Sequence, residues 1–209
     1  MKKIISVLSV LAIVFLVGCS SQDNATNCDE NKYEKNPVAT IQVKDYGNME
    51  FELDINKAPT TVANFTELAN KGFYNGLTFH RIDRSLGIIQ GGDPNGDGTG
   101  GPGYTIKGEV KANNQCNDLE NTKGSIAMAR SQSYDSAGSQ FFINFKDNTK
   151  IFTGDNQYAV FGHIIKGEDI MEKIGVAATE ETIPKPTITI EKISVDTFGQ
   201  KMPEIEKTS

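Results

Sequence analysis

Short stretches of alternating apolar and polar residues recur along the chain, as expected for strands that bury one face. Val38–Lys44 alternates, Asp45–Asn48 has the composition of a turn, and Met49–Asp54 alternates again, which predicts a β-hairpin. Thr187–Val195 shows the same alternation near the end of the chain. Shorter strand-like runs lie between these segments and are bounded by glycines: Thr78–Ile82, Gly87–Gln90, Gly124–Ala129, Phe141–Asn144 and Val160–Ile165.

Two other segments have a helical pattern. Pro59 suits the first position of a helix, and Lys71-Gly72 ends the same segment. Apolar residues recur within it at helical spacing, at Val62, Phe65, Leu68 and Ala69. A second, shorter helix is predicted from Gly167 to Ile174. Many short strands with two helices are typical of an antiparallel barrel or sandwich that carries helices at its ends.

Residues 37–199 make up the predicted domain, which has roughly 160 residues and is long enough to bury one core. No repeat occurs at the periods of about 20–50 residues that mark repeat proteins. Residues 200–209 are polar, and we expect them to form a flexible tail.

The N-terminus has the pattern of an export signal. Lys2 and Lys3 precede an apolar run from Ile4 to Val17, which is shorter than the roughly 20 residues of a membrane-spanning helix. A short transmembrane anchor is the alternative. Leu16-Val17-Gly18-Cys19 resembles the processing box of bacterial lipoproteins, which implies that residues 1–18 are a cleaved signal peptide and that Cys19 carries the lipid. The resemblance predicts an extracytoplasmic protein that acyl chains hold at the cell membrane.

The segment from Cys19 to residue 36 is polar and nearly free of aliphatic residues, so we expect a lipidated, disordered tether. Cys28 and Cys116 are the other two cysteines, and the sequence leaves open whether they form a disulfide or stay free thiols. The formal net charge of −6 becomes −8 once Lys2 and Lys3 are removed. A basic nucleic-acid footprint is therefore not expected.

Few residues outside one region could support chemistry. Residues 93–98 match the start of a calcium-binding EF-hand loop, but Tyr104 stands where the required glutamate belongs. No G-x-S-x-G motif offers a serine nucleophile, and no cluster of metal ligands is present, so neither a metal nor a cofactor is expected. His80 and His163 lie in strand-like runs and are interpreted as packing residues.

Arg81 is the more promising candidate, because an arginine on a strand in apolar surroundings is costly unless it is paired or faces a cleft. An interstrand salt bridge is the alternative interpretation. The amides of Gln90 and Gln140 are suited to orient a guanidinium without cancelling its charge. Phe142, with Ile88 and Met128, is expected to supply an apolar floor.

Five motifs together resemble the cyclophilins, the cyclosporin-type peptidyl-prolyl cis-trans isomerases, in order and nearly in spacing. The resemblance covers about residues 38–195 and implies a mainly β fold, a closed eight-stranded antiparallel barrel capped by two α-helices, with the active groove on its outer face. The motifs are Phe79-His80-Arg81-Ile82, Gln90-Gly91-Gly92-Asp93, Met128-Ala129-Arg130, Gly138-Ser139-Gln140-Phe141-Phe142-Ile143 and Val160-Phe161-Gly162.

The resemblance also implies roles for individual residues. Arg81 would act on the twisted amide, Gln90 would position it, and Phe142 would grip the proline ring. The backbone of Arg130 stands where the family hydrogen-bonds the peptide. The predicted substrate-binding residues are Phe79, Leu86, Ile88, Met128, Ala129, Arg130, Gln140, Phe152 and Tyr158.

Two segments depart from the family pattern. Asp83–Gly87 is one residue longer than the usual linker and lacks its Pro-Gly-Phe, so Leu86 would replace a pocket phenylalanine. Ile151–Asp155 replaces a tryptophan-leucine pair, and Tyr158 replaces a histidine. The altered rim predicts a changed substrate preference and weak cyclosporin binding.

The resulting prediction is a lipid-anchored, monomeric prolyl isomerase that assists the folding of exported, proline-containing polypeptides. The alternative is a non-catalytic module or chaperone at the cell envelope that binds proline peptides. Retention of Arg81, Gln90 and Phe142 together favours the enzyme, because docking alone does not need the arginine.

Overall fold

The computed structural model describes residues 32–177 and 182–208. The predicted N-terminal hairpin is present: β1 (Val38–Val43) pairs antiparallel with β2 (Gly47–Leu53). Asp45 and Gly47 take positive φ angles of 65° and 114° in the tight connection between them. Such angles favour glycine and short polar side chains, which accounts for the turn composition of this stretch.

The helices and the remaining strands lie close to their predicted positions. The helices are α1 (Pro59–Asn70) and α2 (Glu168–Gly175). The longer strands are β3 (Arg81–Asp83), β4 (Ile88–Gly91), β6 (Ser125–Met128), β7 (Phe141–Asn144), β8 (Val160–Lys166) and β9 (Ile190–Asp196). Two short strands, β5 (Thr105–Ile106) and β10 (Lys207–Thr208), and three 3-10 turns, Lys111–Asn113, Tyr134–Ser136 and Gly154–Asn156, complete the elements.

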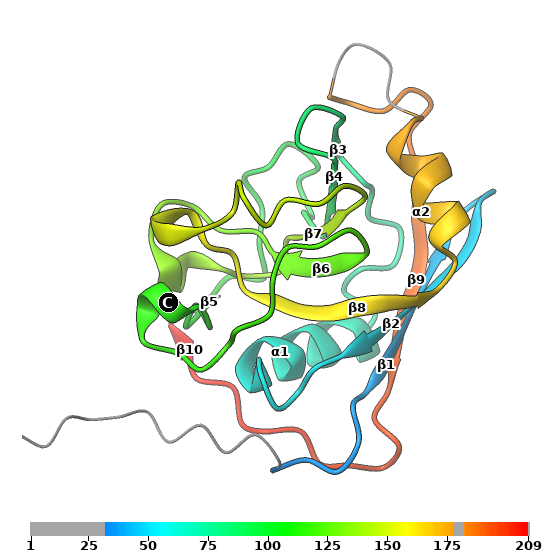
Figure 1. Ribbon diagram of the computed structural model, residues 1–209. Coiled ribbons are helices and arrows are strands. Elements are labelled where there is room, and N and C mark those ends of the chain that lie inside the picture. The colour runs from blue at the N-terminus through cyan, green and yellow to red at the C-terminus, as the bar shows by residue number, and fades with distance from the viewer. Residues whose placement is uncertain (1–31, 178–181, 209) are drawn as a thin grey trace, which may run out of the picture.

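Eight strands form one antiparallel sheet in the order β3-β4-β7-β6-β8-β2-β1-β9, which curls round a core (Figure 1). The sheet is open, so the expected closed barrel is corrected to a curled half-barrel. The physical reason lies at the edges: β3 has only three residues, and no ladder joins it to β9. A single bridge between Thr78 and Thr189 and a few neighbouring backbone bonds hold the two edges near each other.

The core lies inside the curl and is rich in aromatic rings. Phe65 of α1 packs edge-to-face on Phe141, with ring centroids 5.5 Å apart, and lies 5.1 Å from the ring of Phe161. Val62, Phe65 and Leu68 are buried, as the helical pattern predicted. α1 packs against β9, and α2 packs against β2. The two helices therefore cover different parts of the sheet and leave the outer face of β3, β4, β7 and β6 free for a site.

The N-terminus of α1 is capped by a distant carboxylate. Ala58, at the helix N-cap, makes no side-chain cap hydrogen bond, and the first turn contains no acidic residue. The buried Glu109 takes this place: it accepts hydrogen bonds from the Thr60 and Thr61 backbone N–H groups at 2.9 and 2.8 Å and from the Thr61 hydroxyl at 2.6 Å. A carboxylate at this position satisfies free N–H groups and is favoured by the helix dipole.

Residues 200–208, within the segment predicted to be a flexible tail, lie against the domain. β10 pairs antiparallel with β5, Lys207 lies 2.7 Å from Glu67, and Met202 and Ile205 pack against the core. These apolar contacts were hidden in the sequence, because single apolar residues in a polar stretch produce no periodic pattern.

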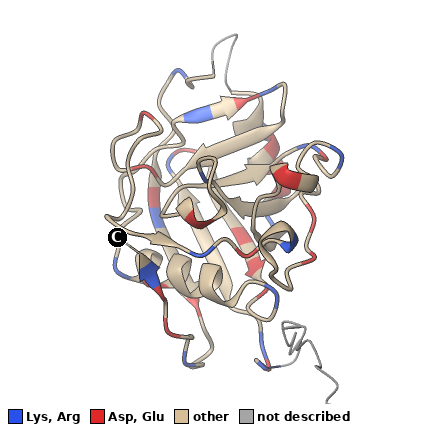
Figure 2. Cartoon of the chain, turned by 90° about the vertical axis from the view of Figure 1, so that its left-hand side faces the viewer, with Lys and Arg blue, Asp and Glu red and all other residues tan. Residues whose placement is uncertain are grey.

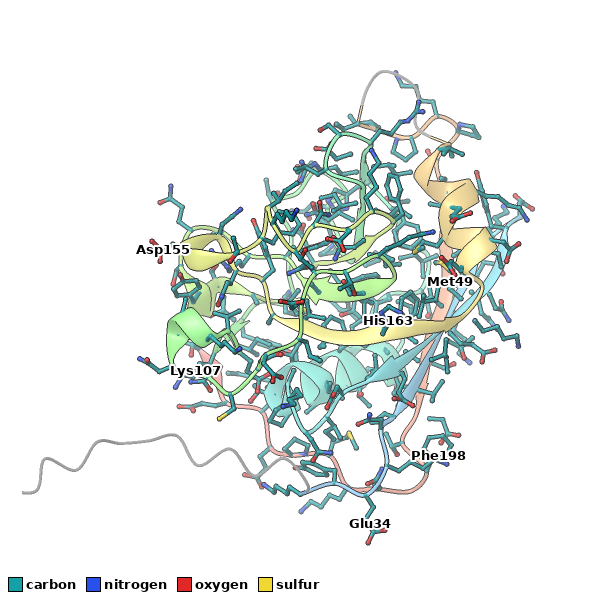
Figure 3. All side chains as sticks on the ribbon, viewed as in Figure 1. Glu34, Met49, Lys107, Asp155, His163 and Phe198 are labelled. Atoms are coloured by element: carbon teal, nitrogen blue, oxygen red, sulfur yellow. The ribbon has the colours of Figure 1, made fainter. Side chains whose placement is uncertain are left out.

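The last part of the predicted tether is also docked. The backbone N–H of Tyr33 donates to Asn56 Oδ1 at 2.9 Å, and the ammonium of Lys35 lies 3.2 Å from the centre of the Phe198 ring. Glu34 and Phe198 accordingly lie at the same end of the molecule (Figure 3). The predicted signal peptide (residues 1–18), Cys19, Cys28 and the tether up to residue 31 lie outside the described residues. Across the described parts of the chain, no helix has the length and apolarity needed to cross a membrane.

Candidate active site

Strand register brings the three predicted catalytic residues side by side on the outer face of the sheet. Arg81 of β3 lies opposite Gln90 of β4, and Gln90 lies opposite Phe142 of β7. Phe142 in turn lies opposite Ala127 of β6. Because strand side chains alternate between faces, these four project outward while their neighbours enter the core.

A chain of amide groups supports the guanidinium. Arg81 Nη1 donates to Gln90 Oε1 at 3.2 Å, and Gln90 Nε2 donates to Gln140 Oε1 at 2.9 Å. Gln140 Nε2 then donates to the carbonyl oxygens of Gly98 and Gly100 at 3.0 and 2.9 Å. The oxygen and the nitrogen of each amide are both hydrogen-bonded, so this chain links the arginine to the glycine-rich loop at residues 96–103.

Asp83 is a second partner of Arg81 that the sequence interpretation missed. Arg81 Nη2 donates to Asp83 Oδ2 at 2.7 Å, and the two side chains are 39% and 13% exposed. Arg81 therefore has a charged partner beside the neutral amide of Gln90, and Gln140 contacts Gln90 rather than the guanidinium. The ion pair lies within β3, between residues two apart on the same face, and it leaves a substantial part of the guanidinium accessible.

An apolar cluster lies on the same outer face of the sheet as the arginine. Its buried members are Phe142, Ile88, Ala127 and Val160. The Phe142 ring lies 5.6 Å from Phe152 and 5.2 Å from Tyr158, measured between ring centroids. The half-buried side chains packed against this cluster are Leu86, Leu119, Ala129, Phe152 and Tyr158. The Arg81 side chain and this apolar cluster therefore lie on one face of the sheet, with Gln90 between them in the strand register.

Two residues predicted to contact substrate belong to the core. Phe79 is fully buried and packs against Phe141, with ring centroids 6.2 Å apart. Met128 is 1% exposed and lies in the same core cluster. Phe79 lies just before β3. On β6, side chains alternate between the two faces, so Ala127, which lies opposite Phe142, faces outward and Met128 enters the core. Alternation from Phe142 across β6 could have identified Ala127, and Val160 already stood in a recognised motif, whereas Leu119 had no signal in the sequence.

The side chain of Arg130 packs against Tyr158, at the edge of the apolar cluster. Its Nε and Nη2 atoms donate to the Gln157 carbonyl oxygen at 2.9 and 2.7 Å. The guanidinium carbon lies 4.7 Å from the ring centre of Tyr134 and 4.9 Å from that of Tyr158. Arg130 also lines a groove with Gln90, Gln140 and Ala129 beside the glycine-rich loop. The predicted role rested on its backbone; the structure adds this stacking.

Neither histidine is placed as a catalytic base. His80 is buried, and neither ring nitrogen has a hydrogen-bond partner. Desolvation lowers the pKa of His80, although the charge of Asp93 opposes the shift. His163 lies on β8 and is exposed (Figure 3), so its interpretation as a packing residue is wrong. Within residues 32–177 and 182–208, no group of three or more His, Cys, Asp or Glu side chains could hold a metal ion.

The charged groups are mixed on the surface. In the view of Figure 2, both basic and acidic residues are scattered over the strands and loops. Together with the net charge of −6, this distribution lacks the single-sign field that would attract a polyanion.

Comparisons with known proteins agree with this geometry. Residues 38–195 match the family described as cyclophilin type peptidyl-prolyl cis-trans isomerase/CLD. Peptidyl-prolyl cis-trans isomerase A of Dickeya dadantii is 40% identical over 160 residues, covering 71% of this chain and 80% of that protein. Peptidyl-prolyl cis-trans isomerase B of Bacillus subtilis is 44% identical over 125 residues, covering 60% and 81%.

The fold is similar to that of a solved relative as well. A Cryptosporidium parvum cyclophilin-type isomerase, crystallised in the presence of the dipeptide Ala-Pro, superimposes with a TM-score of 0.67 at 28% identity. The match covers 77% of this chain and 99% of that one. It therefore spans most of the described part of the chain.

Proposed function

Because the chain belongs to the cyclophilin-type peptidyl-prolyl cis-trans isomerase family, we propose that the groove at Arg81 is its catalytic site and that it acts on exported polypeptides outside the cytoplasm. The isomerase activity itself follows from the family and from its curated relatives. The observation that supports the site best is the strand register, which places the partly exposed Arg81 side chain and the apolar cluster around Phe142 on one face of the sheet.

The reaction demands little chemistry of the protein. Rotation about an X–Pro bond breaks amide resonance and meets a barrier of about 18–20 kcal/mol. No covalent bond to the enzyme forms, and no proton has to leave the substrate. Catalysis therefore requires tighter binding of the twisted amide than of the planar one.

Arg81 supplies the differential interaction in this proposal. As the amide twists, its nitrogen regains a lone pair, and a nearby N–H donor of the guanidinium stabilises that state. Donors that are fixed before the reaction act without further reorganisation. About 7 kcal/mol of such stabilisation corresponds to roughly five decades in rate.

The pocket holds the other half of the substrate. Phe142, with Ile88 and Ala127, offers the apolar floor for a proline ring, and Leu86, Phe152 and Tyr158 form its sides. The relative crystallised with Ala-Pro supports a ligand of this size. Gripping the ring while Arg81 binds the amide would leave the preceding residue free to rotate.

Arg81→Ala tests the catalytic assignment against the alternative of a non-catalytic peptide-binding module. We expect the rate of Ala-Pro isomerisation, measured by a protease-coupled assay or by NMR exchange, to fall by about two to three decades, with the melting temperature little changed. Arg84→Ala is the matched control, since Arg84 is an exposed arginine in the next loop. Wild-type turnover by Arg81→Ala would refute the role of Arg81, and an inactive wild-type protein that still binds the peptide would favour the binding module.

The proposed location rests on the N-terminal pattern and is supported by cysteine chemistry. Cys116 is disulfide-bonded, and its partner lies outside the described residues. Disulfides persist mainly in oxidising compartments outside the cytoplasm. If Cys19 carries lipid, Cys28 is the remaining candidate partner among the three cysteines.

Expression in a bacterium with radiolabelled fatty acid tests the anchor. We expect label on the wild-type chain in the membrane fraction, and none on Cys19→Ala, which should stay unprocessed or unanchored. Label on Cys19→Ala, or an unlabelled wild-type chain in the cytoplasm, would refute the lipoprotein proposal while leaving the isomerase assignment untouched.

A further inference from the structure

One carboxylate joins the catalytic candidate to the longer loop that follows it. Asp83 ends β3 two residues after Arg81, so both side chains lie on the outer face. Its Oδ2 atom accepts the 2.7 Å hydrogen bond from Arg81 Nη2. Gln90 binds the other terminal nitrogen of the same guanidinium. Arg81 is therefore held between one charged acceptor and one neutral acceptor.

The second carboxylate oxygen of Asp83 organises the loop. Oδ1 accepts hydrogen bonds from the Ser85 N–H at 3.0 Å, the Ser85 hydroxyl at 2.6 Å and the Leu86 N–H at 3.0 Å. The Asp83 carbonyl oxygen also accepts from the Gly87 N–H at 2.7 Å. These bonds fix the loop that carries Leu86 to the pocket wall.

We propose that Asp83 is a positioning residue for catalysis, which fixes the Arg81 guanidinium and, through the same carboxylate, sets Leu86 against the proline pocket. The inference rests on the proposed catalytic role of Arg81. It gives the altered loop at residues 83–87 a function, because its first residue both pairs with the arginine and holds the loop.

Two opposing effects of Asp83 must be weighed. Its negative charge weakens the electrostatic pull of Arg81 on a substrate, whereas its hydrogen bond restricts a long and otherwise mobile side chain. The Arg81 side chain is 39% exposed, so solvent screens the charge effect. Orientation is not screened, because a donor must be in place before the amide twists. We therefore expect the ordering effect to exceed the loss of charge.

Asp83 stays ionised under ordinary conditions, so the ion pair is available to the working enzyme. Burial would raise its pKa, but the hydrogen bonds from Ser85 and Leu86 and the contact with Arg81 outweigh this effect and lower it.

Asp83→Asn is the sharpest variant, because an asparagine has a single acceptor oxygen. With that oxygen on the Ser85 and Leu86 side, its NH₂ group faces Arg81 and cannot accept from it. Asp147→Asn is the matched control, since exposed Asp147 accepts the same pair of bonds from Thr149, at 3.0 and 2.7 Å, within a comparable turn. Circular dichroism and thermal melting would confirm that each variant folds.

We expect Asp83→Asn to lower kcat about tenfold, because a less well-oriented Arg81 keeps only part of the two to three decades that its donor contributes, while KM for an Ala-Pro peptide changes less than about twofold. Asp147→Asn should match wild type. In the Arg81→Ala background, Asp83→Asn should cause no further loss, because its effect passes through the arginine. NMR exchange of the peptide measures the residual rates that this comparison requires.

The results separate the two proposals. Wild-type kcat in a folded Asp83→Asn variant, a higher kcat, or an equal further loss in the Arg81→Ala background would each overturn the role of Asp83. Full activity in Arg81→Ala alone would instead overturn the catalytic role of Arg81.

Discussion

Replacing Glu109 by alanine tests how the fold holds the start of α1. The change removes the acceptor of three hydrogen bonds, two of them from backbone N–H groups of the first helical turn. Thr61 is 1% exposed, so water cannot replace the lost partner at its N–H. Loss of a helix cap costs about 0.5–2 kcal/mol, and each stranded buried donor costs about 1–3 kcal/mol.

A compensating effect reduces this cost. Burial raises the pKa of Glu109, and the hydrogen bonds from Thr61 and Thr60 only partly oppose it. Desolvation of the buried carboxylate therefore costs free energy, and this cost disappears when alanine replaces Glu109. We expect Glu109→Ala to lower the free energy of unfolding by about 2–3 kcal/mol at neutral pH, measured by urea denaturation. Glu109→Gln, which keeps the volume and one acceptor oxygen, should lose about half as much.

The pH dependence provides a second check with a defined sign. Because the pKa of Glu109 is raised in the folded state above its ordinary value of 4.5, the folded protein binds the proton more tightly. The stabilisation that proton binding by Glu109 contributes is complete below pH 4.5 and declines as the pH rises through the pKa of the folded state. Glu109→Gln lacks this titration, so its deficit relative to wild type should be larger near pH 4 than at pH 7, by the linkage relation.

Equal unfolding free energies for wild type and Glu109→Ala would refute the cap. A deficit of Glu109→Gln that grows from acidic to neutral pH would refute the raised pKa. Asp118→Ala is a suitable control, because Asp118 is a more exposed carboxylate near this region that pairs with Lys57 at 3.0 Å and makes no contact with α1's first N–H groups.

Two further predictions concern the active groove. The value of kcat/KM should be flat from about pH 6.5 to 8, because guanidinium groups keep their proton. Desolvation lowers the pKa of His80 below its ordinary 6.5, and hydrogen bonds lower that of Asp83, so neither group titrates within this range. A limb above pH 6.5 would contradict this. Arg130→Ala should raise KM about three- to tenfold with little change in kcat, because it removes the guanidinium that stacks on Tyr158 and does not touch the reacting amide. Arg130→Lys should have the same effect. An unchanged KM in both variants would contradict the role of the stacked guanidinium.

Sequence pattern was sufficient where a residue's environment is set by its neighbours along the chain. The alternation of β1 and β2 placed the hairpin, and helical spacing placed the buried face of α1 at Val62, Phe65 and Leu68. The motifs located Arg81 and Gln90, which the register brings together across β3 and β4.

The pattern failed where both faces of a strand are buried or where a partner is distant. All four residues of β6 are buried, so apolarity alone could not show that Ala127, rather than Met128, faces the groove. Glu109 contacts a helix 48 residues earlier in the chain, and no local signal announces such a contact. Asp83 was overlooked for a different reason: its loop departs from the family pattern, so resemblance offered no role for it.

The order of the site depends on the core behind it. Arg81, Gln90 and Phe142 are neighbours only in the observed register of β3, β4 and β7, and the same register turns Ile82, Ile89 and Ile143 inward. A slip of all three strands by one residue would exchange the two faces and turn the three isoleucines, each at most 1% exposed, out of the core. At about 1.5–3 kcal/mol for each side chain, the slip would cost roughly 5–9 kcal/mol, comparable to the whole stability of a domain. The apolar core therefore enforces the spacing of the catalytic face, and substitutions on that face can change the chemistry while the register stays fixed.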